Sequence, residues 1–158
     1  MIALEPLYSL FTLDWEQVVS HLVLLTIAYL LAVPIGWDRE VESRGMGLRT
    51  FPLVAVGSCG FLLLSTEVLP GSEAQARVLY GLITGIGFIG GGAILKRDNR
   101  VSGTATAAAI WTTGAIGAAV AYRRYEIALV LSMMTFATLR FMLPLKSVAR
   151  NGGSRDAD

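Results

Sequence analysis

The run from Gln17 to Gly36, QVVSHLVLLTIAYLLAVPIG, decides what kind of protein this chain is. It is twenty residues long and holds no Lys, Arg, Asp or Glu. A bilayer core is about 30 Å thick and a helix rises about 1.5 Å per residue, so about 20 apolar residues span it. The run is continuously apolar rather than alternating, which favours a membrane helix over a strand of a membrane barrel.

Four further apolar stretches approach the same length. The composition agrees, because 54% of the residues are apolar and only 16% are charged, whereas soluble domains average about 25% charged residues. The sequence therefore predicts an all-α membrane protein, a compact bundle of about five transmembrane helices within residues 17–143. The expected helices cover residues 17–36, 51–69, 78–95, 104–122 and 126–143.

Lys and Arg are distributed unevenly between the two sets of loops, and positive charge is retained on the cytoplasmic side of a membrane. We therefore expect residues 1–16 to lie outside the cytoplasm and residues 144–158 to form a disordered cytoplasmic tail, with Pro144 ending the last helix. Nine basic residues lie on the expected cytoplasmic side, against three on the other: Arg39, Arg44, Arg49, Lys96, Arg97, Arg100, Lys146, Arg150 and Arg155, against Arg77, Arg123 and Arg124.

Small residues dominate the third and fourth expected helices. Gly81 and Gly85 are four residues apart, as are Gly87 and Gly91, and this spacing lets two helix backbones approach closely in lipid. One interpretation is the packed core of the bundle. The other is a gating interface, or irregular backbone that lines a polar cavity. The predicted helix-packing residues are Gly81, Gly85, Gly87, Gly90, Gly91, Gly92, Gly103, Ala107 and Gly114.

Acids and bases alternate between Trp37 and Thr50, after the first expected helix. One interpretation is an interfacial anchor, with Trp37 among the lipid headgroups and the arginines on anionic lipid. The other is a site in which Asp38, Glu40 and Arg49 bind an ion, an anion or a partner. The carboxylates suit a hydrated divalent cation, although the arginines compete for them, so the identity of any metal stays open.

Several functional classes are disfavoured. No ionisable residue lies near the middle of an expected span, where pumps and proton-coupled carriers usually keep one. His21 is the only histidine, which excludes a histidine-based metal cluster. No nucleophile, base and orienting group can be assembled, so we expect neither an enzyme nor a cofactor. A net charge of +1 gives no reason to expect a nucleic-acid partner.

Three motifs resemble those of the MgtC/SapB family of bacterial inner-membrane proteins. They are Gly36-Trp37-Asp38-Arg39-Glu40 with Gly47-Leu48-Arg49-Thr50, the stretch GIGFIGGGAIL at 85–95, and Val101-Ser102-Gly103 with Thr106-Ala107-Ala108 and Trp111. The resemblance implies the membrane domain of such a protein, without the C-terminal cytoplasmic domain that many members carry. It marks Asp38, Arg39, Glu40, Arg49 and Thr50 as the candidate functional residues.

The same resemblance supplies an expected function. Members of the family are implicated in growth at low magnesium, and at least some act by restraining another membrane complex, the F-type ATP synthase. We therefore expect a non-enzymatic regulator or adaptor in the bacterial plasma membrane, linked to magnesium limitation or ionic stress. It would act through another membrane protein or as a homo-oligomer. The alternative is an oligomeric channel or carrier for magnesium or another cation.

Overall fold

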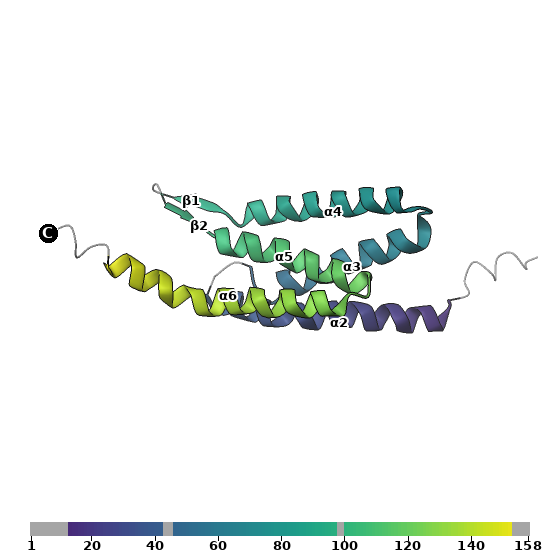
Figure 1. Cartoon of the computed structure of the whole chain (residues 1–158), viewed down its shortest axis with the longest axis horizontal. Coiled ribbons are helices and arrows are strands. Elements are labelled where there is room, and N and C mark those ends of the chain that lie inside the picture. The colour runs from purple at the N-terminus through teal and green to yellow at the C-terminus, as the bar shows by residue number, and fades with distance from the viewer. Residues whose placement is uncertain (1–12, 43–45, 98–99, 153–158) are drawn as a thin grey trace, which may run out of the picture.

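The computed structural model describes residues 13–42, 46–97 and 100–152, and helices make up most of them. The helices lie side by side in one elongated bundle (Figure 1). The predicted all-α bundle is therefore confirmed. The helices are α2 (Trp15–Glu42), α3 (Thr50–Val68), α4 (Ser72–Gly92), α5 (Thr104–Ala121) and α6 (Tyr125–Gly152).

Four of these helices are long and apolar enough to cross a membrane, namely α2, α3, α5 and the Tyr125–Met142 part of α6. At 21 residues, α4 is also long enough. Its first turns, however, carry Glu73 and Arg77, and its second half holds most of its six glycines. These residues lower its mean hydropathy, so the third expected span is a helix of weaker membrane character than the other four.

Two helices run further than the sequence predicted. α2 continues through Pro34 to Glu42 instead of ending at Gly36, and α6 continues through Pro144 to Gly152. A proline removes one backbone N–H, and in membrane proteins neighbouring groups or water commonly satisfy the carbonyl that is left over. The expected disordered tail is thus wrong for 144–152. Residues 1–12 of the expected N-terminal segment and residues 153–158 of the tail lie outside the described residues.

A short antiparallel hairpin joins α4 to α5, where the sequence predicted only a charged loop. Its strands are β1 (Leu95–Arg97) and β2 (Arg100–Ser102), with Lys96 opposite Val101. Gly103 then turns the chain into α5 with a φ of +82°. A Cβ at this position would overlap the carbonyl oxygen of Ala93. Only glycine suits this junction, because it alone adopts positive φ readily and has no Cβ.

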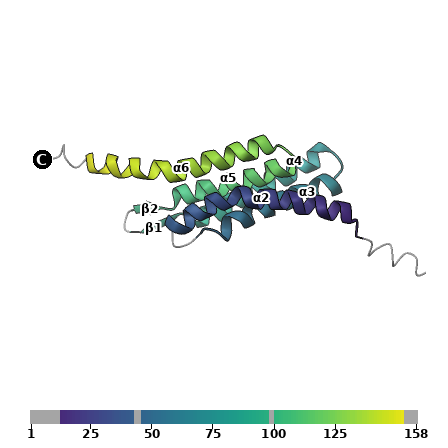
Figure 2. The ribbon, with the colours of Figure 1, turned by 90° about the horizontal axis from the view of Figure 1, so that it is seen from below.

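The fourth expected span, α5, forms the centre of the bundle. It packs against α2, α3, α4 and α6, and Figures 1 and 2 place it between them. Within the membrane-length windows, 61% of α5 is buried, against 17–39% for the other three spans. Its fully buried Ile110, Ile116 and Val120 meet Ile35 of α2 and Leu62 of α3 in one apolar core.

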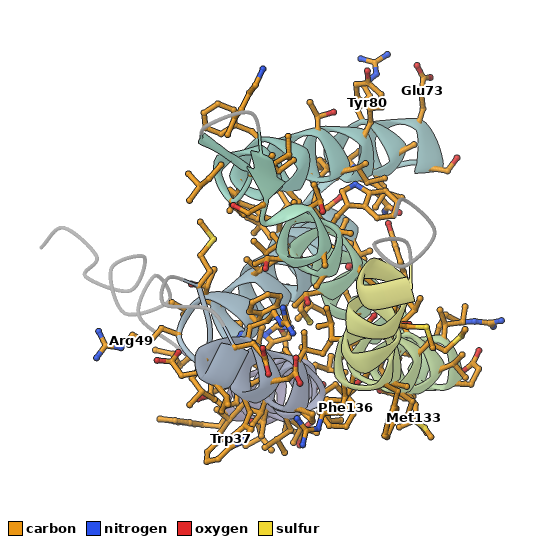
Figure 3. All side chains as sticks on the ribbon, turned by 90° about the vertical axis from the view of Figure 1, so that its left-hand side faces the viewer. Trp37, Arg49, Glu73, Tyr80, Met133 and Phe136 are labelled. Carbon is orange, nitrogen blue, oxygen red and sulfur yellow. The ribbon has the colours of Figure 1, made fainter. Side chains whose placement is uncertain are left out.

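The third expected helix, α4, lies at the edge of the bundle. It packs mainly against α5 and α3, and only Ile86 and Gly90 of its residues are buried. Tyr80 is 74% exposed and Phe88 85% exposed. Figure 3 shows Tyr80 and Glu73 pointing away from the other helices. One long face of α4 is therefore left without a partner in the part of the chain that the structure describes.

Candidate functional site

The charged residues after Gly36 lie on a helix rather than in a loop. Because α2 extends to Glu42, Asp38 and Arg39 occupy its last turns, and both are only 5% exposed. Trp37, between them and Gly36, is 62% exposed and points away from the bundle (Figure 3). The helix thus turns its acid and its base inward and its tryptophan outward.

Asp38 and Arg39 form a buried ion pair. Arg39 donates from Nε at 3.1 Å and from Nη2 at 2.5 Å, both to Oδ2 of Asp38. A buried charge is costly unless it is paired, and removing one partner of such a pair typically costs about 3–5 kcal/mol. This pair therefore contributes to the packing of α2. Because both side chains are buried, they are less accessible to a soluble ligand than the sequence alone suggested.

Glu40 fastens α2 to the start of α3. Its Oε2 accepts a hydrogen bond of 3.0 Å from the backbone N–H of Leu48. The carbonyl oxygen of Gly47 then accepts from the N–H groups of Thr50 and Phe51, which begins α3. No side chain caps α3 from its own N-cap position. A carboxylate near the N-terminus of a helix is stabilising. The Glu40 carboxylate on α2 therefore takes the place of the side-chain cap that α3 lacks.

Two glycines make this fastening possible. A Cβ on Gly36 would lie 3.3 Å from the carbonyl oxygen of Gly47, and a Cβ on Gly47 would overlap the Glu40 side chain. The backbone of α2 and the backbone that leads into α3 therefore come this close because both positions are glycine. Gly36 and Gly47 are part of the first motif, but they were not among the predicted helix-packing residues.

Arg49 and Thr50 lie apart from the buried pair. Arg49 is exposed and projects outward (Figure 3), and its side chain makes no ion pair or hydrogen bond in the described part of the chain. Thr50 is half-buried at the first turn of α3. The five candidate residues thus lie at one end of the bundle in three distinct environments, rather than converging on one pocket.

The structure gives no direct support for a metal centre in this cluster. Across residues 13–42, 46–97 and 100–152, no group of three or more His, Cys, Asp and Glu side chains is arranged to hold a metal ion. Asp38 is directed to Arg39, and Glu40 is directed to the Leu48 amide. The chemistry available here is charge pairing and backbone anchoring.

The predicted packing residues divide into two groups. Gly90, Gly103 and Gly114 face other parts of the chain: a Cβ on Gly90 would lie 3.1 Å from the carbonyl oxygen of half-buried Ala107, and one on Gly114 would overlap Ile86. Gly81, Gly85, Gly87, Gly91 and Gly92 face open space, with no atom within 4 Å of an added Cβ. No packing by this second group is therefore seen among residues 13–42, 46–97 and 100–152.

One close helix contact involves a residue that was not among the predicted packing set. A Cβ on Gly117 would overlap the backbone carbonyl oxygen of Ala55 and come 2.9 Å from Cβ of Ser58. This contact holds α3 against α5. Its signal in the sequence is the spacing of Gly114 and Gly117, which places two small residues on one side of α5.

A second polar site lies at the opposite end of the bundle. Nε2 of His21 on α2 lies 2.6 Å from Oε1 of Glu67 on α3. Both residues line a cavity of about 320 Å³, together with Gln17, Ser20, Leu24, Leu63, Thr66, Ala121 and Arg123. The sequence could not have paired His21 with Glu67, because 46 positions separate them and no local motif connects them.

Comparison with known proteins identifies the family. The MgtC family model matches residues 25–148. The chain is 35% identical over 127 residues to "Putative magnesium transporter YhiD" of Escherichia coli K12, covering 76% of this chain and 59% of YhiD. It is 35% identical over 149 residues to "Protein SrpB" of Synechococcus elongatus, covering 86% of this chain and 80% of SrpB.

A third relative is "Protein MgtC" of Brucella abortus, 34% identical over 134 residues, which are 85% of this chain and 56% of that protein. The chain thus spans little more than half the length of YhiD and of this MgtC. No solved structure matches it. The family model covers most of the helical bundle, including both ends of the fastening between α2 and α3. The chain belongs to the MgtC family.

Proposed function

We propose that this chain is a non-enzymatic multi-pass regulator or adaptor that acts on another membrane protein when magnesium is limiting or ionic conditions change. Family membership supports a membrane protein, and the name of one relative, "Putative magnesium transporter YhiD", connects the family with magnesium. The proposal places the chain in the bacterial plasma membrane, with the end that carries Asp38 and Arg49 on the cytoplasmic side.

The observation that carries this proposal is the open face of α4. Gly81 and Gly85 are one helical turn apart, and no atom of the described residues lies within 4 Å of a Cβ added at either of them. In lipid, helices associate where small residues let their backbones come close. A row of glycines that is empty within the bundle therefore suits the docking of a helix from another protein, with Tyr80 and Phe88 exposed beside it.

The charged end supports the same proposal in a different way. The Asp38–Arg39 pair and the Glu40 hydrogen bond to Leu48 fix the end of α2 against the start of α3. Exposed Trp37 and Arg49 project from this fixed base. Such an end presents one aromatic and one basic side chain in a defined geometry, which suits recognition of a partner better than it suits catalysis.

The test is capture of the partner from membranes of the native host. The tagged full chain is cross-linked and purified from cells grown at low and at high magnesium. We expect a second membrane protein at low magnesium, lost in the Gly81→Leu/Gly85→Leu variant because the new side chains fill the open face. Thr26→Leu, at an exposed position on α2, is the matched control and retains the partner.

Two results would contradict the proposal. A chain that purifies alone at both magnesium levels has no stable partner. Capture of only a differently tagged copy of the same chain would make α4 a self-association surface. In each variant, the yield and the helical circular dichroism of the purified chain report whether the bundle itself is intact.

The second candidate is an oligomeric channel or carrier for magnesium. The name of the E. coli relative, "Putative magnesium transporter YhiD", favours it, and the His21–Glu67 cavity offers one carboxylate at the end of the bundle opposite Asp38. Purified chain in liposomes that contain a magnesium-sensitive dye tests this candidate. Magnesium entry that depends on the protein and falls in Glu67→Gln would favour it over the regulator.

A further inference from the structure

A groove runs between α3 and α4 on the outside of the bundle, beginning at Arg49. It has a volume of about 400 Å³. Leu53, Gly57 and Phe61 line it from α3, and Leu82, Ile86 and Ile89 line it from α4. The one hydroxyl in its middle, that of Ser58, donates to the carbonyl oxygen of Val54 in its own helix. From Leu53 to Phe61, the α3 wall of the groove therefore offers hydrocarbon and no unused hydroxyl group.

The groove has one charged end. Arg49 lines its mouth beside Thr50, and Arg49 has no ionic partner among the residues that the structure describes. The Glu40 carboxylate at the start of α3 accepts a hydrogen bond from the Leu48 backbone N–H. Lys96 adds a second exposed positive charge just beyond the end of α4. The mouth is thus suited to a negatively charged group.

The length of the groove matches one leaflet of a bilayer. From Arg49 to Phe61 the wall formed by α3 extends about 18 Å, at about 1.5 Å per residue. Half of a hydrocarbon core of about 30 Å is about 15 Å. Gly57, midway along this wall, has no atom within 4 Å of an added Cβ, so the groove remains open where an acyl chain would pass.

We propose that this groove binds one anionic phospholipid, with an acyl chain between α3 and α4 and the headgroup phosphate at Arg49. The shape selects a chain that extends along the bilayer normal, and the charge selects an anionic over a zwitterionic headgroup. The α4 residues that line the groove are Leu82, Ile86 and Ile89, and the glycines Gly81 and Gly85 are not among them. The site does not depend on the regulatory function proposed above.

Native mass spectrometry of the full chain tests the proposal. The chain is purified from nanodiscs that contain equal amounts of phosphatidylglycerol and phosphatidylcholine, and the retained lipids are counted. We expect retained phosphatidylglycerol, and we expect Arg49→Gln to lower its preference over phosphatidylcholine about fivefold, as for the loss of one interfacial charge. Gly57→Leu, which fills the groove, should lose both lipids. Inorganic phosphate at millimolar concentration should displace neither, since the acyl chain supplies part of the binding.

The controls are Arg77→Gln, an exposed arginine at the other end of α4, and Thr26→Leu on the exposed surface of α2. Both should retain phosphatidylglycerol as the unmodified chain does. Equal retention of the two lipids by the unmodified chain, or unchanged selectivity in Arg49→Gln, would overturn the proposal. Displacement by inorganic phosphate would also overturn it. Because Arg49 is exposed, Arg49→Gln gives a decisive result even if Gly57→Leu fails to fold.

Discussion

The helices α4 and α5 have the same glycine- and alanine-rich character in the sequence, yet they occupy opposite situations in the bundle. Of α5, 61% is buried, and the helix packs against every other described helix. In α4, only Ile86 and Gly90 are buried. A Cβ on Gly114 or Gly117 of α5 would overlap a neighbour, and one on Gly81 or Gly85 of α4 would meet nothing. Small residues therefore permit close approach on both helices, but among the described residues it is mainly the glycines of α5 that are in close contact with a neighbour.

The largest expected effect comes from breaking the buried ion pair and comparing it with the exposed pair on α4. Asp38→Ala removes the carboxylate that pairs with Arg39 in a site that is 5% exposed, so we expect a loss of about 3–5 kcal/mol of stability. Glu73→Ala breaks the Arg77–Glu73 pair, whose side chains are about four-fifths exposed, and should cost less than about 0.5 kcal/mol. Unfolding midpoints in detergent provide the measurement.

A double variant distinguishes pairing from simple loss of volume. Asp38→Leu/Arg39→Met removes both charges and keeps the site filled, and replacing a buried pair in this way is often neutral. We therefore expect the double variant to be clearly more stable than Asp38→Ala. If the two variants lose the same stability, then the loss of charge pairing does not account for the destabilisation by Asp38→Ala.

The next effect tests the two glycine-rich helices directly with the same substitution. Gly117→Ala forces a methyl group into the carbonyl oxygen of Ala55, and overpacking of this kind typically costs about 1–3 kcal/mol. The expected sign is clear, because the obstructing atom belongs to the backbone and cannot rotate away. The measurement is again the unfolding midpoint in detergent, with the helix content of each variant as a check. A Gly117→Ala variant as stable as the original chain would contradict the tight contact between α3 and α5.

Much of the fold could be predicted because lipid imposes a simple length requirement on helices. Each expected span overlaps an observed helix, but α2 runs past its expected end at Gly36, and α6 runs past Leu143 because Pro144 does not stop it. The hairpin of β1 and β2 also went unpredicted. Its strands are three residues long, too short to produce a readable alternation of polar and apolar residues.

The candidate site was predictable in residue type but not in arrangement. The motif from Gly36 to Thr50 contains the residues that join α2 to α3. The sequence could not tell that Asp38 and Arg39 turn inward while Arg49 turns outward, because that depends on which side of α2 meets the other helices. The centrality of α5 was hidden for the same reason, since a helix of uniformly small apolar residues has no polar side to mark its orientation.

A smaller effect is expected from the hydrogen bond that connects α6 to α2. Oγ of Ser132 donates to the carbonyl oxygen of Leu31 at 2.6 Å. Such bonds between membrane helices contribute about 0.6 kcal/mol on average and at most about 1.7 kcal/mol, so Ser132→Ala should lose an amount in this range. Thr138→Val is the control, because the Thr138 hydroxyl bonds to Met134 within α6 itself. If the two variants lose equal stability, the bond to Leu31 adds nothing to packing.

The smallest effect, with the opposite sign, is expected on the open face of α4. Gly85→Ala adds a methyl group where no atom lies within 4 Å, and alanine favours a helix over glycine by up to about 1 kcal/mol. We therefore expect the isolated chain to be unchanged or slightly more stable, in contrast to Gly117→Ala. If α4 docks a partner helix as proposed, the same variant should weaken capture of that partner, because one methyl group separates two closely packed backbones. If the isolated chain loses stability, then Gly85 makes a contact within the bundle. The glycines of α4 would then resemble Gly114 and Gly117 of α5, which pack against neighbouring residues.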